Sequence, residues 1–353
     1  MTRMHASRAH PAPLILSPSR LHTLFLWMAL LLAAFAPLQA ARADQRYAAF
    51  VIDAHSKEVL HEEASDEPRY PASLTKMMTL YLLFEAIDRG QVRLEERMVA
   101  SREAALQPPS KLGIAAGGTI TVEDAIKALV TRSANDVAVV VAEHLAGTQE
   151  RFASKMTAKA RELGMSRSRF VNASGLPNPL QQTTARDMAT LGQALIEDYP
   201  QFYGYFQTPS IKWGRLYARN HNNLLGKVEG VDGIKTGYTR ASGFNLVSSV
   251  EREGARIIAV VMGGETALAR DNQMRYLIDQ SFQTLHARGP NAARFASLPL
   301  ERAAFDAPEP RGVQAGAPGP GVAQGSAGDE DALARAAEVI RQAEGDEGEG
   351  EAD

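Results

Sequence analysis

The segment 74–87, LTKMMTLYLLFEAI, is apolar on almost every side when it is wound into a helix. A helix without a polar face is stable only when it is buried. The rest of the chain must therefore pack around this segment. A charged residue near its start, Lys76, is expected to share that burial.

Strand patterns occur on both sides of this helix in the sequence. Residues 47–53 and 58–62 are predicted strands, and the tight turn at 55–57 joins them into a hairpin. Strands at both ends of the chain with helices between them predict an α+β fold, not alternating βαβ units. The later strands are predicted at 233–236, 244–249 and 256–262 with a turn at 251–254, and the further helices at 122–130, 135–145, 151–163, 184–196 and 270–285.

The first 43 residues have the pattern of a secretory signal peptide. A basic stretch without acidic residues is followed by an apolar run at 24–37 and by Ala41-Arg42-Ala43. The run is shorter than the roughly 20 residues that span a bilayer, so cleavage is predicted and the mature protein is expected in the periplasm. Residues 44–288 then form one globular domain. Residues 289–353, rich in Pro, Gly and acidic side chains, are predicted to be a disordered tail.

Composition excludes several classes of site. The 353 residues include no cysteine, which excludes thiol catalysis, disulfides and thiolate metal sites. No two histidines stand at a metal-ligand spacing such as H-E-x-x-H, so no metal is expected. No glycine motif for phosphate binding is present and the formal net charge is -3, so neither a nucleotide cofactor nor a nucleic-acid partner is expected.

A possible nucleophile and its base lie at the start of the apolar helix. Ser73 and Lys76 form an S-x-x-K sequence, and residues three apart share one face of a helix. A serine hydroxyl needs an adjacent base, and a lysine can serve as that base when burial and nearby positive charge lower its pKa. Backbone N–H groups at the helix start are suited to an oxyanion. In isolation the same pattern is typical of an N-cap serine followed by an exposed lysine.

Two further short motifs follow in order. Ser133 and Asn135 form S-x-N, in which a hydroxyl can pass a proton to a leaving amine and an amide can bind a substrate amide. Lys235, Thr236 and Gly237 form K-T-G. On an edge strand, Thr236 can contact a carboxylate, Gly237 allows close approach of a substrate backbone, and Lys235 adds positive charge near Lys76. Each motif alone also fits a helix cap or a strand end.

The three motifs occur in the order used by penicillin-binding proteins and class A β-lactamases. The chain resembles the D-alanyl-D-alanine carboxypeptidase family of low-molecular-mass penicillin-binding proteins over residues 47–286. The resemblance implies the serine β-lactamase/DD-transpeptidase fold, with an antiparallel sheet flanked by helices, a helical subdomain and the site between them. The segments that carry it are YPASLTKMMT, TRSANDVA, FVNASGLPNP, TTARDMA, NHNNLL, GVDGIKTGYTRASGFNLV and AVVMGGE.

The resemblance also implies a function: removal of the terminal D-alanine from peptidoglycan stem peptides, without a cofactor, through an acyl-enzyme on Ser73. β-Lactams are then expected as covalent inhibitors. Backbone N–H groups of Ser73 and Tyr238 are implied as the oxyanion hole, although family members often carry histidine where Tyr238 stands. Arg270 is implied as a ligand of the terminal carboxylate, and His221 as a further site residue.

Three other functions remain open at this point. A DD-endopeptidase that cuts cross-links has the same motifs. A class A β-lactamase needs a glutamate between the second and third motifs, and none of the glutamates there lies in the E-x-x-L-N form. A non-catalytic wall-binding protein is expected to have a damaged motif. Family members often continue into a second domain and a membrane anchor, whereas this chain runs into the acidic tail, so membrane association is left undecided.

Overall fold

The structure is a computed structural model that describes residues 46–287. The predicted signal peptide and the predicted tail lie outside the described residues. Within the described part of the chain, no helix is both long enough and apolar enough to cross a lipid bilayer.

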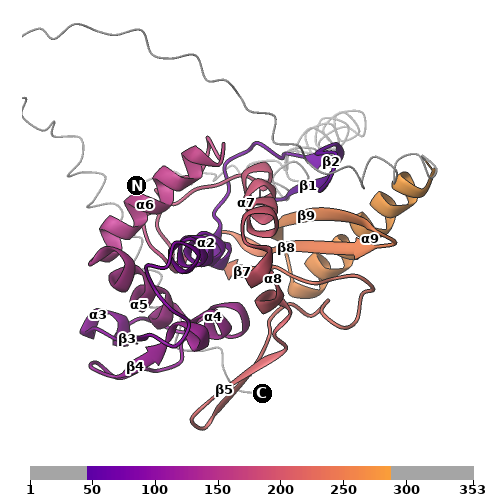
Figure 1. Cartoon of the computed structure of the whole chain (residues 1–353). Coiled ribbons are helices and arrows are strands. Elements are labelled where there is room, and N and C mark those ends of the chain that lie inside the picture. The colour runs from indigo at the N-terminus through magenta and orange to yellow at the C-terminus, as the bar shows by residue number, and fades with distance from the viewer. Residues whose placement is uncertain (1–45, 288–353) are drawn as a thin grey trace, which may run out of the picture. The chain divides into compact units, whose positions relative to one another are not determined.

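A five-stranded antiparallel sheet is the frame of the described body (Figure 1). The strand order is β2-β1-β9-β8-β7, so the first strands of the body pair with the last. Both the predicted hairpin and the α+β class are confirmed. The strands are β1 (Ala48–Asp53), β2 (Val59–Glu63), β7 (Lys235–Thr239), β8 (Gly243–Arg252) and β9 (Ala255–Gly264).

The two faces of the sheet are both covered by helices. Along β1, Ala48, Phe50 and Ile52 belong to one core cluster, and Ala49 and Val51 belong to the other, as the two-residue period of a strand requires. Helix α7 (Ala185–Asp198) packs on the first face and α9 (Ala267–Ala287) on the second. The sheet is therefore buried on both sides, and its edge at β7 is available for a site.

The apolar helix predicted from the sequence is α2 (Thr75–Asp88), and it lies at the centre of the helical region. All of its residues from Thr75 to Phe84 are buried. Its start differs by one residue from the predicted start at Leu74, and Ser73 lies in a preceding 3-10 turn, η1 (Ala72–Leu74). The N-cap of α2 is Leu74, so the capping interpretation of Ser73 is wrong.

The remaining helices surround α2 and largely follow the sequence pattern. The hydroxyls of Thr121 and Thr184 accept hydrogen bonds from the backbone N–H groups three residues later, at 3.1 and 3.0 Å, as N-caps do. Ser133 does not cap the helix after it, because the N-cap there is Ala134. These helices are α4 (Val122–Thr131), α5 (Asn135–Ala146) and α6 (Gln149–Glu162), accompanied by α3 (Arg102–Ala105) and by the short strand pair β3 (Arg97–Val99) and β4 (Thr119–Thr121).

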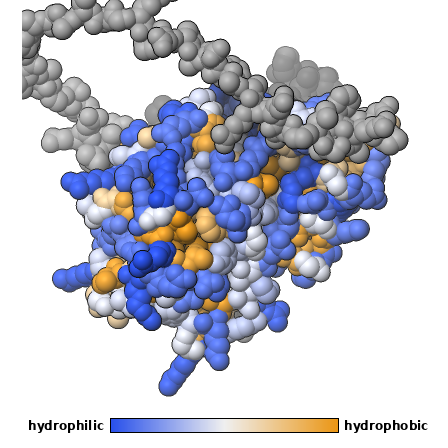
Figure 2. All heavy atoms as spheres, viewed as in Figure 1, coloured by the Kyte–Doolittle hydropathy of each residue, from blue (hydrophilic) through white to orange (hydrophobic). Residues whose placement is uncertain are grey.

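A hairpin that the sequence analysis did not predict extends from the body (Figure 1). It consists of β5 (Ser210–Trp213) and β6 (Leu216–Arg219), and it follows α8 (Pro200–Tyr203) and the 3-10 turn η2 (Gly204–Gln207). The face seen in Figure 2 is mostly hydrophilic, with hydrophobic side chains gathered near its middle, over the region of α2.

Candidate active site

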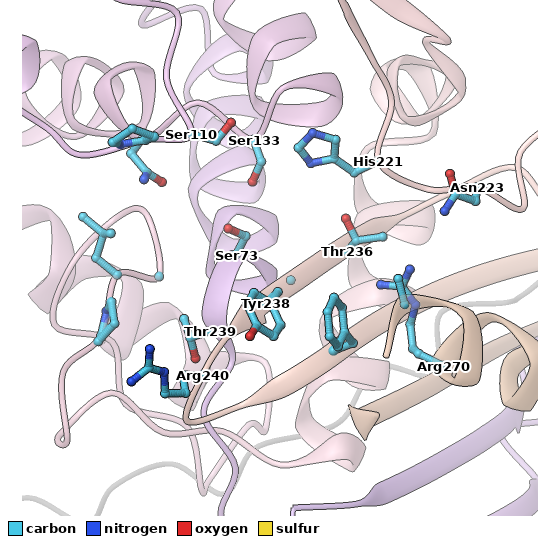
Figure 3. Close-up of a pocket in the computed structure, with 18 residues that line it drawn as sticks. Ser73, Ser110, Ser133, His221, Asn223, Thr236, Tyr238, Thr239, Arg240 and Arg270 are labelled. Atoms are coloured by element: carbon cyan, nitrogen blue, oxygen red, sulfur yellow. The ribbon is translucent and has the colours of Figure 1, made fainter. Parts of the chain in front are cut away.

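A cavity of about 630 Å³ lies where β7, the turn before α2 and the turn before α5 meet (Figure 3). Among the described residues, none of those that line it is acidic. Most of the predicted site residues contribute to this lining: Ser73, Ser133, Asn135, Thr236, Gly237, Tyr238, Arg270 and His221. Lys76 and Lys235 are buried in the wall behind it, with 0% and 1% of their surface exposed.

Lys76 connects three parts of the site through its amine. Its Nζ lies 3.2 Å from Ser73 Oγ, 2.8 Å from Asn135 Oδ1 and 2.5 Å from the backbone carbonyl oxygen of Ser174. Three neighbours of this kind fix the amine in space one helical turn from the Ser73 hydroxyl.

The environment of Lys76 disfavours its charged form. Burial holds the pKa of Lys76 well below its usual range, and the positive charge of Lys235 lowers it further. The carboxylate of Asp136 acts in the opposite direction. A fully buried amine with a second amine nearby is therefore held toward the neutral state that a base requires.

Ser133 has two features that the sequence did not indicate. Its φ is +59°, a left-handed conformation that is uncommon for any residue except glycine. Its Oγ is buried and has no hydrogen-bond partner among the described residues, although the side chain lines the cavity. A strained backbone that holds an unsatisfied hydroxyl against a cavity indicates a role in binding or chemistry.

Asp136, next to the S-x-N motif, anchors the loop on the far side of the cavity. Its buried carboxylate accepts hydrogen bonds from the N–H groups of Leu112, Gly113 and Ile114, at 3.1, 2.8 and 3.2 Å. Asn135 is fixed from the same side, because its Nδ2 donates to the carbonyl oxygen of Pro108 at 3.0 Å. The amide oxygen of Asn135 is thereby oriented toward Lys76.

Lys235 lies at the first position of the edge strand β7. Its Nζ donates to the backbone carbonyl oxygen of Thr236 at 2.9 Å. Burial, and then the positive charge of Arg270, lowers the pKa of Lys235 to about 7. The K-T-G motif thus places a second buried amine whose charge acts on Lys76, as the sequence predicts.

Strand β7 approaches the Ser73 backbone so closely that a side chain at position 237 would be crowded by backbone atoms. A Cβ added to Gly237 would lie 3.0 Å from Ser73 N and 3.1 Å from Leu74 N. Asn245 on β8 holds the two segments together, because its Nδ2 donates to the carbonyl oxygens of Tyr70 and Pro71 at 3.1 and 3.3 Å. This contact brings the N–H of Ser73 next to the part of β7 that carries Tyr238.

Two further side chains with basic groups, those of Arg270 and His221, face the cavity near Thr236 (Figure 3). Arg270 is buried, with its Nε 2.9 Å from Asp271 and its Nη1 3.0 Å from the carbonyl oxygen of Asn245. It is therefore a fixed wall residue, not a surface helix residue. The side chain of His221 is exposed on the cavity side, and partial desolvation, followed by the charge of Lys235, lowers the pKa of its imidazole.

Several contributors to the site could not be read from motifs. Ser174 acts through its backbone carbonyl, Asp136 through contacts with a distant loop, and Ser110 lines the cavity without belonging to a motif. The sequence indicated two of these residues only by their position next to a motif or in a family segment. Asp136 follows Asn135 directly, and Ser174 lies in the FVNASGLPNP segment.

The glutamates between the second and third motifs do not line the cavity. Glu143 accepts a hydrogen bond from Ser101 at 2.8 Å, and Glu162 and Glu197 pair with Lys159 and Lys57. Among the described residues, the cavity lining therefore contains no glutamate of the kind that class A β-lactamases use for deacylation. Within the described residues, no three His, Asp or Glu side chains are grouped so as to hold a metal ion.

Comparison with known proteins gives consistent matches. A family model described as D-alanyl-D-alanine carboxypeptidase matches residues 37–266. The chain is 35% identical over 267 residues to D-alanyl-D-alanine carboxypeptidase DacC of Escherichia coli (strain K12), which corresponds to 74% of this chain and 66% of that protein. The chain thus spans about two thirds of the length of this curated relative.

Solved structures agree with these matches. Penicillin binding protein 5 from Haemophilus influenzae superposes with a TM-score of 0.65 at 31% identity, covering 67% of this chain and 70% of that one. Penicillin-Binding Protein D2 from Listeria monocytogenes in its cefotaxime-bound form gives 0.61 at 32% identity, covering 67% and 96%. With the family model matched over more than half of its residues, the chain belongs to the D-alanyl-D-alanine carboxypeptidase family of serine peptidases.

Proposed function

We propose that this protein is a serine-type D-alanyl-D-alanine carboxypeptidase that removes the terminal D-alanine from peptidoglycan stem peptides. The observation that carries the proposal is the fully buried Lys76 amine, 3.2 Å from the Ser73 hydroxyl at the wall of a cavity whose described lining residues include none that is acidic. Family membership supports the reaction type.

In the first step, Ser73 Oγ attacks the carbonyl carbon of the penultimate D-alanine while Lys76 takes the hydroxyl proton. A neutral amine has two N–H donors and one lone pair. The oxygen atoms of Asn135 and Ser174 can only accept, so they occupy the two donors and leave the lone pair for the Ser73 hydroxyl. The geometry therefore supports Lys76 as the general base.

The negative charge that develops on the carbonyl oxygen is stabilised by the N–H groups of Ser73 and Tyr238. The close approach of Gly237 to Ser73 N supports this assignment, because it brings both donors to one side of the cavity. The tetrahedral intermediate then collapses as its C–N bond breaks. Ser133 carries a proton to the departing amine of D-alanine, a role that its unsatisfied hydroxyl supports.

The substrate is recognised by side chains of the cavity wall other than the nucleophile and its base. The terminal carboxylate of the peptide lies against Thr236 and Arg270, and the Asn135 amide faces the substrate amide. Arg270 suits this role because Asp271 and Asn245 already fix its guanidinium, so little side-chain entropy is lost on binding. Water then hydrolyses the acyl-enzyme and regenerates Ser73.

The same chemistry makes β-lactams covalent inhibitors, since opening of the lactam ring acylates the same hydroxyl. A solved relative is a penicillin-binding protein with cefotaxime bound, which supports this extension. The absence of a glutamate from the described lining supports slow release of the adduct. We further propose that residues 1–43 direct the enzyme to the periplasm, where its stem-peptide substrate occurs.

The test is release of D-alanine from a pentapeptide that ends in D-Ala-D-Ala. The parent protein is expected to release one equivalent, and Lys76→Met is expected to lower kcat/KM by roughly a thousandfold, within the range that a positioned general base contributes. Lys127→Met, which removes a lysine from the surface of α4, serves as the matched control. Conversion of cross-linked muropeptide dimers to monomers without loss of terminal alanine would contradict the proposal and indicate an endopeptidase.

A further inference from the structure

The β5–β6 hairpin has two chemically different faces. Its register places Ile211 opposite Ala218 and Lys212 opposite Tyr217. Residues directly opposite each other on neighbouring strands lie on the same face, and successive residues alternate between faces. Ile211 and Ala218 are buried in the core cluster that also contains residues of α2. Lys212 and Tyr217 therefore lie on the outer face, where both are exposed.

The outer face of the hairpin is basic and aromatic. Arg219 lies on the same face two residues after Tyr217, and Arg215 lies at the turn, where the hairpin extends farthest from the body (Figure 1). Tyr217 is 62% exposed. The sequence has no Asp or Glu from Tyr199 to Val228. The hairpin thus carries positive charge and supplies no acidic group to balance it.

No contact in the described part of the chain neutralises these charges. Lys212, Arg215 and Arg219 form no ion pair with another residue of the range 46–287. The hydroxyl of Tyr217 lies beside Ser210 and Arg219, and hydrogen bonding to Ser210 first, then to Arg219, lowers the pKa of Tyr217. A neutral phenol of this kind leaves the charge of the guanidinium uncompensated.

Helix α4, which packs against β5, does not supply the missing negative charge. Its first turn contains Glu123 and Asp124. Glu123 already pairs with Lys127 at 2.9 Å, and no ion pair among the described residues joins Asp124 to the hairpin. The outer face therefore remains positively charged next to its own neighbours.

The hairpin is continuous with the wall of the active-site cavity. His221 follows the last residue of β6 by two positions, and His221 and Asn223 both line the cavity (Figure 3). A molecule bound to the outer face of the hairpin therefore lies beside any peptide that occupies the cavity. The two are suited to be parts of one polymer.

The proposed substrate has the chemistry that complements this face. A stem peptide that is not cross-linked ends in a carboxylate, and removal of D-alanine leaves a new terminal carboxylate on the residue before it. Free stems therefore stay anionic before and after the reaction. Peptidoglycan around the stem in the cavity presents such carboxylates repeatedly, and guanidinium and ammonium groups bind them in charge-assisted hydrogen bonds.

We propose that the outer face of the β5–β6 hairpin is a docking surface for the carboxylates of neighbouring stem peptides in peptidoglycan. The inference rests on the proposed carboxypeptidase function and extends it from one stem peptide to the polymer. Each exposed ion pair contributes little alone. Several contacts to the polymer that also fills the cavity raise the effective concentration of stem peptides at Ser73.

The test uses two variants with the same change in net charge. The hairpin variant replaces the three cations of the outer face and turn in one protein: Lys212→Gln, Arg215→Gln and Arg219→Gln. The control variant replaces three exposed arginines outside the hairpin and the cavity lining: Arg93→Gln, Arg102→Gln and Arg151→Gln. All six side chains are exposed, so both variants are expected to keep the thermal midpoint of the parent.

Three measurements are made on each protein: co-sedimentation with purified peptidoglycan sacculi, D-alanine release from sacculi, and D-alanine release from a soluble pentapeptide. The hairpin variant is expected to lose roughly tenfold in sacculus binding and in release from sacculi, within the range of three exposed ion pairs. Its kcat/KM for the soluble pentapeptide is expected to stay at the parent value. Added salt is expected to weaken sacculus binding of the parent more than that of the hairpin variant.

The outcomes separate the docking role from a general charge effect and from a membrane role. Equal sacculus binding by the parent and the hairpin variant, or an equal loss in both variants, would overturn the docking surface. Binding of the parent to phosphatidylglycerol vesicles that only the hairpin variant loses, with sacculus binding unchanged, would also overturn it. D-alanine release from neither substrate by the parent would overturn the carboxypeptidase function instead, and sacculus binding, which needs no turnover, would still decide the docking role.

Discussion

A lysine can act as a base in this site because of where its amine is held. Lys76 has no exposed surface, and its pKa is held well below the usual range by burial and by the charge of Lys235. Desolvation of an ammonium group is costly, and a like charge nearby adds to that cost. The surroundings of Lys76 thus favour its neutral form, and removing the charge of Lys235 is expected to raise its pKa.

Lys235→Met is expected to shift the acidic limb of the pH–rate profile for penicillin acylation to higher pH. Substitution removes a positive charge, so the pKa of Lys76 rises and a smaller fraction of the amine is neutral at a given pH. The effect is strongest below about pH 7, because the pKa of Lys235 itself is about 7 and its charge is lost above that value. The measurement is the second-order rate of penicillin acylation of the parent and of Lys235→Met between about pH 5 and about pH 9, on either side of the Lys235 pKa.

Lys127→Met is the reference for this pH series, since it removes a lysine from the surface of α4. If the acidic limb of the pH–rate profile stays at the same pH in Lys235→Met, Lys76 is not the group whose ionisation limits the acylation rate.

Among individual residues, the sequence predicted those site residues whose side chains belong to the three motifs. Ser73, Lys76, Ser133 and Lys235 were placed together by their order and spacing, and the structure groups them around one cavity. The carbonyl of Ser174 was not predictable, because every residue carries such a group and only folding determines where it points. The capping interpretation of Ser73 failed because a 3-10 turn precedes the helix.

At the level of elements, the site depends on three segments that meet without space between their backbones. The turn η1 lies between β7 and the loop that contains Gly175. Gly175 has a φ of +88°, and a Cβ at this position would lie 1.9 Å from the carbonyl oxygen of Ala72 and 2.9 Å from Ser73 N. The position of the nucleophile is therefore set partly by the absence of a side chain 102 residues further along the chain.

Gly175→Ala is expected to lower both the thermal midpoint and the acylation rate. Gly164→Ala is the matched control, because Gly164 has a similar φ of +82° but no atom within 4 Å of its added Cβ. Strain of the backbone alone costs about 1–2 kcal/mol, or a few degrees in the midpoint for a body of this size. The steric overlap at Gly175 is expected to make its loss several times larger.

Differential scanning fluorimetry and penicillin labelling measure the two effects. Equal midpoints for Gly175→Ala and Gly164→Ala would contradict the close packing of η1 against the 175 loop, and normal labelling of Gly175→Ala would show that this packing does not position Ser73.

Elements with a strong pattern were predictable, and short elements with mixed composition were not. The buried α2, the Thr121 and Thr184 helix starts and the β1–β2 hairpin agree with prediction within a few residues. The β5–β6 hairpin was missed because each strand in SIKWGRLYAR has only four residues, too few for a clear period, around a turn at Gly214-Arg215. Tertiary contacts, not local propensity, decide such elements.

For the whole molecule, the described residues 46–287 contain the sheet, both helical layers and the complete proposed site. The last helix among the described residues, α9 (Ala267–Ala287), packs Leu277, Ile278 and Phe282 against the sheet. We therefore propose that the boundary predicted at residue 288 marks the end of the catalytic domain.

A chain that ends at residue 288 is expected to keep the acylation rate and the thermal midpoint of the full chain. The physical reason is that the described contacts of the site and of α9 are made among residues 46–287. A midpoint lower by more than about 4 °C, which corresponds to roughly 1 kcal/mol for a domain of this size, would show that the segment after 288 contributes to stability and would contradict the proposed boundary.

The central claim is that Ser73 is the hydroxyl that becomes acylated. Intact-protein mass spectrometry after exposure to benzylpenicillin tests it most directly, with the parent protein compared with Ser73→Ala. We expect one penicilloyl adduct per parent molecule, mapped to the peptide that contains Ser73, and no adduct on Ser73→Ala. An adduct of the same size on Ser73→Ala, or an unmodified parent protein, would contradict it.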